Sequence, residues 1–139
     1  MFYRHISKQG LLSHRYHTAM STRGIRGATQ ISDNSSESIN SGVLELVKSM
    51  LLENSVDTDD LVSIVFTATI DLTAQFPAVA ARELGLGNVP LLCSVEIDVP
   101  GALPRVIRVL MHINTDKGLK DIKHIYLHGA SALRKDIAQ

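Results

Sequence analysis

Six polar or ionisable side chains lie in apolar or glycine-rich stretches, where chains seldom place such groups. They are Arg26 in "GIRGAT", Arg82 in an alanine-rich segment, Glu96 and Arg108 in apolar runs, Tyr126 in another, and Arg134 just after it. Guanidinium groups bind carboxylates through paired hydrogen bonds, and a lone glutamate can accept a hydrogen bond from a ligand hydroxyl. The set predicts a site for a small dianionic ligand.

Each of these residues also has a purely structural explanation. A structural ion pair would account for Glu96 and Arg108, because a buried carboxylate without a partner is costly. Arg82 and Arg134 fit ordinary solvated cations, and Tyr126 fits a packed ring with its hydroxyl at the rim. Arg26 is the hardest to explain in this way, because its flanking glycines indicate that the backbone closely approaches something, such as a ligand.

No pattern for metal, phosphate or nucleophilic chemistry is evident in the sequence. The six histidines have no spacing of a recognised metal site, and no glycine-rich phosphate loop occurs. Cys93, the single cysteine, has no evident histidine partner and fits a small core residue. We therefore expect no metal and no cofactor, so that any catalysis would depend on positioning and electrostatics.

Composition is typical of one globular domain. The chain has 139 residues, of which 45% are hydrophobic and 20% charged, and its formal net charge is zero. Such a charge gives no nucleic-acid footprint, and no apolar run reaches the roughly 18–20 residues of a membrane span. A single cysteine cannot form an internal disulfide, which favours a reducing compartment such as the cytoplasm.

The first 19 residues differ from the rest, because they contain Arg4, Lys8 and Arg15 but no acid. We expect residues 1–19 to be a disordered, dispensable basic leader and residues 20–139 to form the domain. An organellar transit peptide is the alternative for the leader, since such peptides share this acid-poor composition.

Hydrophobic periodicity predicts the elements that must position these side chains. Strands are expected at 22–31, 61–70, 89–99, 105–115 and 122–133, and helices at 35–55 and 74–84. Ser35 or Ser36 is the expected N-cap of the first helix, and Gly85 and Gly87 should end the second. This order predicts an α+β domain with a mixed sheet and helices on one face. The other face would need cover, so we expect an oligomer.

Four segments resemble the monofunctional AroH-class chorismate mutases. They are "RGIRGAT", "ATIDLTAQFPAVAAREL", "VPLLCSVEIDVPGALPRVIRVLMHINT" and "IKHIYLHGASALR", which together span about residues 22–134 in the family's order and spacing. The resemblance implies a homotrimeric pseudo-α/β barrel with active sites between subunits. It also implies rearrangement of chorismate to prephenate, on the route to phenylalanine and tyrosine.

The resemblance further implies roles for individual residues. Glu96 would accept a hydrogen bond from the ring hydroxyl of chorismate, and Arg108, on a strand beside that of Glu96, would stabilise charge on the breaking ether oxygen. Arg26 and Tyr126 would hold the enolpyruvyl arm and its carboxylate. The remaining matches are a site cysteine, a wall from the neighbouring subunit and a basic residue near the mouth: Cys93; Phe76, Ala78 and Arg82; and Arg134.

Cys93 and Glu96 raise a geometric question, because residues three apart in a regular strand face opposite sides. Either the strand is bulged there, or Cys93 contributes through its backbone.

Two other functions compete with the mutase. An imine deaminase of the YjgF/Rid type resembles this trimeric architecture and also uses an interfacial arginine. A non-catalytic trimer could instead bind a small metabolite as a regulator. The presence of Glu96 and Arg108 together with "RGIRGAT" favours the mutase.

Overall fold

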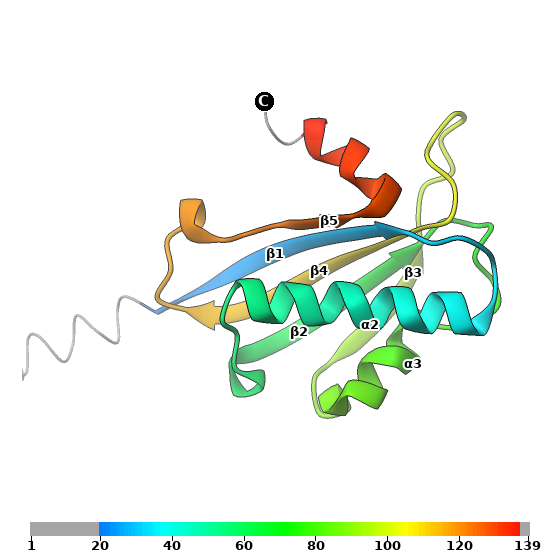
Figure 1. The fold of residues 1–139 in the computed structure, drawn as a ribbon. Helices are drawn as coiled ribbons and strands as arrows, with labels where there is room; N and C mark the ends of the chain where they lie inside the picture. The colour runs from blue at the N-terminus through cyan, green and yellow to red at the C-terminus, as the bar shows by residue number, and fades with distance from the viewer. Residues whose placement is uncertain (1–19, 137–139) are drawn as a thin grey trace, which may run out of the picture.

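Five strands form one mixed sheet, in the order β3-β2-β4-β1-β5, in the computed structural model, which describes residues 20–136 (Figure 1). The strands are β1 (Ser21–Gln30), β2 (Leu61–Ala68), β3 (Leu91–Val95), β4 (Val106–Thr115) and β5 (Ile125–Leu127). β4 is antiparallel to β1 and β2, whereas β3 is parallel to β2 and β5 is parallel to β1. The predicted mixed sheet is confirmed, and the predicted leader at 1–19 lies outside the described residues.

Two helices, α2 (Ser36–Glu53) and α3 (Pro77–Ala81), cover one face of this sheet (Figure 1). Ser35 caps α2, because its hydroxyl accepts a hydrogen bond from the Ser38 backbone N–H at 3.1 Å. The core includes Ile25, Phe66 and Met111 of the three central strands. The buried positions of α2 recur every three or four residues: Ile39, Val43, Leu46, Val47 and Met50. Helices on one sheet face, as predicted, are therefore observed.

Gly27 lets α2 pack directly on β1. A Cβ atom at this position would lie 2.4 Å from Met50 Sδ and 3.1 Å from Leu46 Cδ1. The glycine that follows Arg26 therefore accommodates the helix, and not a ligand as its position beside an arginine had indicated. The close packing of α2 on β1 also fixes the position of the strand that carries Arg26.

Strand β3 is shorter than predicted and ends at Val95, not at residue 99. Its neighbour β2 ends at Ala68, whose carbonyl accepts the last hydrogen bond, from the Glu96 N–H at 2.9 Å. Beyond this point the chain has no strand to pair with and leaves the sheet. Glu96 therefore lies just after the strand that was expected to contain it.

Strand β5 is also shorter than predicted, with three residues in place of 122–133. His128 has a φ of 52°, in the left-handed region, which turns the chain out of the strand. The 3₁₀ helix η5 (His128–Asp136) follows, so Arg134 lies in a helix.

The second predicted helix, at 74–84, is also shorter as an α-helix. Pro77 occupies its first turn, where a missing N–H is tolerated, and the π-helical turn η3 (Arg82–Leu86) continues it. Gly85, with a φ of 87°, provides the left-handed residue at the end of this turn. Short 3₁₀ helices η2 (Thr58–Asp60) and η4 (Leu119–Asp121) occupy two of the connections.

Candidate functional site

The sheet face opposite the helices, here called the open face, carries four of the predicted site residues. The strand registers align Ser94, Thr67, Arg108, Ala28 and Tyr126 in one row across all five strands. Arg108 and Tyr126 are thus separated by β1 alone, which puts their backbones about 10 Å apart. Arg26 pairs with Leu110, so it lies on the same face, one position further along the alternation.

Glu96 and Arg108 form an ion pair on this face. The distance between Arg108 Nε and Glu96 Oε1 is 3.8 Å, and the two side chains are 48% and 28% exposed. Thr67 donates a hydrogen bond from Oγ1 to the other carboxylate oxygen, Glu96 Oε2. The pair lines a cavity of about 460 Å³ together with the loop at 97–104 and Leu133. A charged pair that remains partly exposed beside a cavity can still bind a ligand.

The strand arrangement between these two residues differs from the expectation. Arg108 was expected beside the strand that carries Glu96, but β2 lies between β3 and β4. Thr67 of β2 occupies the intervening position and contacts the Glu96 carboxylate. Thr67 fits the strand expected at 61–70, but its contact with the Glu96 carboxylate can be inferred only once the strand order is known.

Arg26 is exposed on β1, and its backbone is tied to a histidine that the sequence did not single out. The Arg26 N–H donates to Nδ1 of His124 at 2.9 Å. Partial burial lowers the pKa of His124 below its usual 6.5, and the nearby Arg26 guanidinium lowers it further. His124, Tyr126 and Arg134 line one cavity of about 500 Å³. Arg134 therefore lines the same cavity as Tyr126.

The other predicted site residues lie around α3 and are called the α3 group: Phe76, Ala78, Arg82 and Cys93. Phe76 is 70% exposed and lines, with Cys93, a groove of about 550 Å³. Arg82 is exposed at the end of α3, whereas Ala78 is buried in the core.

Cys93 and Glu96 do not face the same side. Cys93 pairs with Phe66 and packs against the core beneath the helices, whereas Glu96 reaches Thr67 on the open face. β3 pairs with β2 in an uninterrupted register, so no bulge brings the two together. Within one chain eight of the nine predicted site residues therefore form two groups, one on the open face and one around α3, and Arg134 lines the Tyr126 cavity from η5.

Within residues 20–136, no three His, Cys, Asp or Glu side chains gather closely enough to hold a metal ion. None of the helices in that range is both long enough and apolar enough to cross a membrane.

The chain is similar to known proteins over most of its length. The family model described as "Chorismate mutase type I" matches residues 22–137. A protein named "Chorismate mutase AroH" from Thermus thermophilus is 46% identical over 116 residues, which cover 83% of this chain and 95% of that protein. The protein of the same name from Bacillus subtilis is 41% identical over 120 residues, covering 86% and 94%.

A solved structure, the chorismate mutase from Clostridium thermocellum, has the same fold. The two superpose with a TM-score of 0.78 at 52% identity, covering 79% of this chain and 98% of the other. The match to the family model extends from β1 to the C-terminal helix and includes every residue of both groups. The chain belongs to the type I, or AroH-class, chorismate mutase family.

Proposed function

We propose that this chain converts chorismate to prephenate as a homotrimer, in sites between subunits that use the residues of both groups. The observation that carries the proposal is the open face of the sheet. There Glu96 and Arg108 contact one another, and Tyr126 lies on the same side. Cations, a carboxylate and a phenol on one face suit a ligand with two carboxylates and a hydroxyl.

The proposed mechanism rests on stronger binding of the transition state than of the substrate. Arg26 and Tyr126 hold the enolpyruvyl arm over the ring, and Glu96 accepts a hydrogen bond from the ring hydroxyl. The ether C–O bond breaks as the new C–C bond forms, and negative charge grows on the ether oxygen. Arg108 stabilises that charge. The reaction is unimolecular and requires no proton transfer.

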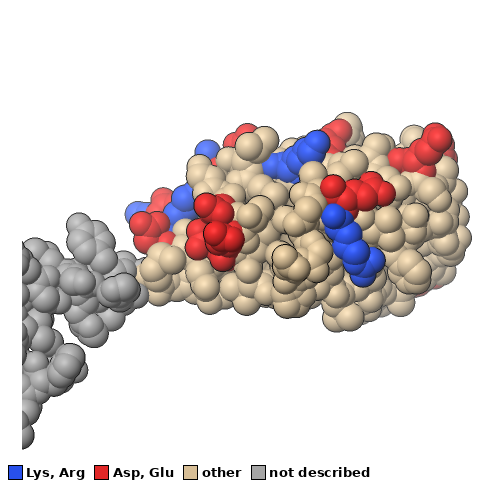
Figure 2. All heavy atoms as spheres, turned by 90° about the horizontal axis from the view of Figure 1, so that it is seen from below, with Lys and Arg blue, Asp and Glu red and all other residues tan. Residues whose placement is uncertain are grey.

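The assembly is proposed from apolar side chains at the β3 edge and in the adjoining loop. Phe76, Leu92, Val95 and Ile97 are all more than 60% exposed there. Figure 2 views the molecule from below, from the side of α3, where charged residues are few and scattered. An exposed edge strand with apolar neighbours is a surface that a second chain can cover.

A trimer would also account for the division of the site residues. The α3 group of one subunit would face the open face of the next, so that Phe76, Arg82 and Cys93 complete a site begun by Glu96 and Arg108. Cys93 would then act from the neighbouring wall, which agrees with its position opposite Glu96 in its own chain.

Subunit complementation tests this proposal. Arg82→Ala and Arg108→Ala subunits are each expected to form weakly active trimers, but mixed trimers should regain intact sites. Random mixing should restore on the order of a quarter of all sites, since each needs Arg82 from one subunit and Arg108 from its neighbour. The matched control mixes Arg26→Ala with Arg108→Ala, which remove residues of the same group, so no site should be restored.

The wild-type assay separates the competing functions. Chorismate loss followed by absorbance is expected for the mutase. Ammonia release from an imine without chorismate loss would indicate the deaminase, and chorismate binding without turnover would indicate a regulator. Turnover by the wild type with no recovery in the Arg82 and Arg108 mixture would contradict the shared sites alone.

We also propose that residues 1–19 are a dispensable leader and that the enzyme acts in the cytoplasm. All the proposed site residues lie between Arg26 and Arg134. Deleting residues 1–19 should leave turnover and the melting temperature unchanged, and loss of either would contradict the leader proposal.

A further inference from the structure

The segment that carries Tyr126 has little sheet pairing of its own. β5 pairs with β1 through three residues, matching Gly27 with Ile125, Ala28 with Tyr126 and Thr29 with Leu127. A short edge strand of this kind needs other contacts to fix its register. Two side chains outside the strand pairing supply these contacts.

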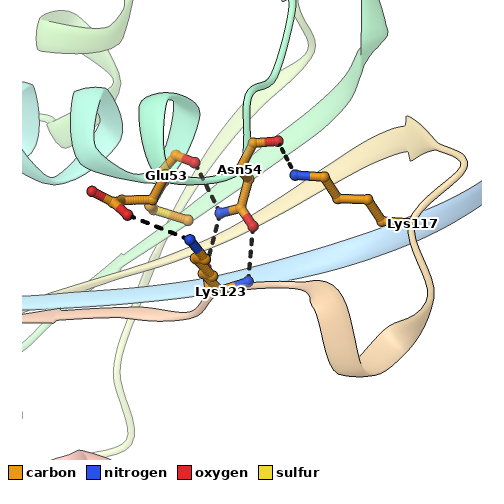
Figure 3. Close-up of polar contacts among 5 residues, drawn as sticks. Glu53, Asn54, Lys117 and Lys123 are labelled. Atoms are coloured by element: carbon orange, nitrogen blue, oxygen red, sulfur yellow. Dashed lines mark hydrogen bonds and ion pairs between the residues drawn. The ribbon is translucent and has the colours of Figure 1, made fainter.

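The first is Asn54, which follows α2 and is only 2% exposed (Figure 3). Its Nδ2 donates to the Lys123 carbonyl at 2.8 Å and to the Met50 carbonyl at 3.0 Å, and its Oδ1 accepts from the Lys123 N–H at 2.8 Å. The Lys117 ammonium donates to the Asn54 carbonyl at 2.6 Å, as Figure 3 also shows. The end of α2 therefore holds the main chain at Lys123, immediately before His124.

The second is His124, whose Nδ1 accepts the Arg26 N–H at 2.9 Å. This N–H lies just outside the β1–β5 pairing, which begins at Gly27. Nδ1 can accept only when it carries no proton, so the contact requires the neutral imidazole with its hydrogen on Nε2. Protonation would put an N–H opposite an N–H and remove the contact.

The charges around His124 disfavour protonation. Arg26 contacts His124 from β1. The cavity that His124 lines is also lined by Lys123, Glu53, Tyr126 and Arg134. Arg26 and the cavity lining thus contribute three cations and one carboxylate near His124, of which Lys123 pairs with Glu53 at 3.9 Å. Burial and the Arg26 guanidinium lower the pKa of His124, in agreement with a neutral ring in the folded chain.

We propose that neutral His124 is a positioning residue, which holds the backbone of Arg26 in register with Tyr126 and makes substrate capture sensitive to acid. The inference rests on the proposed mutase function, in which Arg26 and Tyr126 hold the same part of the substrate. Asn54 fixes the segment, and His124 transmits its position to β1.

The direction of the pH effect follows from the lowered pKa. A histidine that is harder to protonate in the folded chain favours the ordered segment fully above its unfolded value of 6.5. That contribution is lost as the pH falls through the folded pKa. The KM for chorismate should therefore rise on the acid side, while kcat changes less.

Two variants separate the role of His124 Nδ1 as a hydrogen-bond acceptor from the protonation of the ring. In His124→Asn, the amide Oδ1 replaces Nδ1 as the acceptor but does not titrate, so KM should stay flat between about pH 5 and pH 8. His124→Phe removes the acceptor, and KM should rise about threefold to tenfold at every pH. If His124→Phe fails to fold, the comparison between wild type and His124→Asn still decides.

His128→Asn is the matched control. This exposed histidine lies on the same segment, and its Nε2 contacts Glu45 Oε1 at 2.7 Å, away from Arg26. Asparagine tolerates its φ of 52°. The variant should keep the wild-type pH profile of KM, because His124 is intact.

An NMR titration of His124 gives a readout that does not depend on turnover. The ¹⁵N shifts should show an unprotonated Nδ1 at neutral pH, and the Arg26 amide signal should shift as the ring protonates. A proton on Nδ1 at neutral pH, or an acid rise in KM that persists in His124→Asn, would overturn the proposal. If the NMR titration gave the expected result but chorismate was not turned over at any pH, the enzyme function would be contradicted instead.

Discussion

Arg108 and Arg26 lie on the same face of the sheet, but their surroundings differ. Arg108 contacts Glu96 at 3.8 Å and lines a cavity, whereas Arg26 is exposed on β1 and tied by its backbone to His124. These surroundings suit different tasks. A cation fixed beside a carboxylate can be aimed at one developing charge, whereas an exposed guanidinium can hold a carboxylate that the substrate carries throughout.

Replacing Arg108 with alanine should reduce kcat about 10²–10³-fold while the protein stays folded. The reason is that the transition state would lose a charged donor at the ether oxygen. A neutral isostere of arginine, such as citrulline, is the sharper test, because it keeps shape and hydrogen bonding but removes the charge. Steady-state kinetics with circular dichroism would check both. A raised KM with unchanged kcat would show that Arg108 contributes only uniform binding.

Arg26→Ala provides the contrast, and its main effect should be a marked rise in KM. In the proposed mechanism, it would remove a contact that is equally strong in the bound substrate and in the transition state. The reverse pattern, with kcat lost at Arg26 and KM raised at Arg108, would overturn the two roles without changing the reaction.

At the scale of elements, the sequence predicted what depends on one segment and missed what depends on two. Periodicity predicted a strand at 105–115, where β4 lies, and periodicity with the Ser35 cap located α2. The end of β3 depends on where its neighbour β2 ends, and the end of β5 depends on the turn at His128. The periodicity of a single segment carries no information on either.

The same limit applies to the candidate site. Arg26, Glu96, Arg108 and Tyr126 could be proposed from the sequence because their types conflict with apolar or glycine-rich settings. Thr67 was missed because a threonine in a strand gives no such conflict, and its role requires β2 to lie between β3 and β4. The backbone contact of His124 likewise appears only when β5 is placed beside β1.

Gly27→Ala should destabilise the fold by about 1–3 kcal/mol through overpacking against α2. The added Cβ would lie 2.4 Å from Met50 Sδ, so the helix or the side chain must shift. Gly24→Ala is the matched control on the same strand, because its nearest neighbour, Leu110 Cδ1, is at 3.4 Å. Urea unfolding of both variants would check this, and equal losses would contradict the assigned role of Gly27.

At the scale of the whole molecule, the apolar edge and the division of site residues point to the same assembly. β3 is an edge strand, and the exposed Val95 and Phe76 lie along one groove beside it. In the proposed trimer, the open face of one subunit and the α3 group of the next form each site together. Activity should therefore depend on association.

Val95→Lys should dissociate the proposed trimer and abolish turnover, because an unpaired charge buried in the proposed interface would be costly. Val95 is 63% exposed in the single chain, so the substitution should leave the monomer folded. Leu52→Lys is the control, since Leu52 is 78% exposed on α2. Analytical ultracentrifugation would compare them, and a fully active monomer of either would contradict shared sites.

The position of β5 beside β1 has a consequence for synthesis on the ribosome. β1 is the first strand to emerge, whereas β4 and β5, which flank it in the sheet, come later than β2 and β3. At typical elongation rates, the nascent chain leaves β1 unpaired for on the order of 5–20 seconds. Arg26 is thus translated early but gains its neighbour Tyr126 only with the last strand. A chain truncated before residue 125 would lack β5, so the β1 edge that β5 pairs with would be left exposed to chaperones.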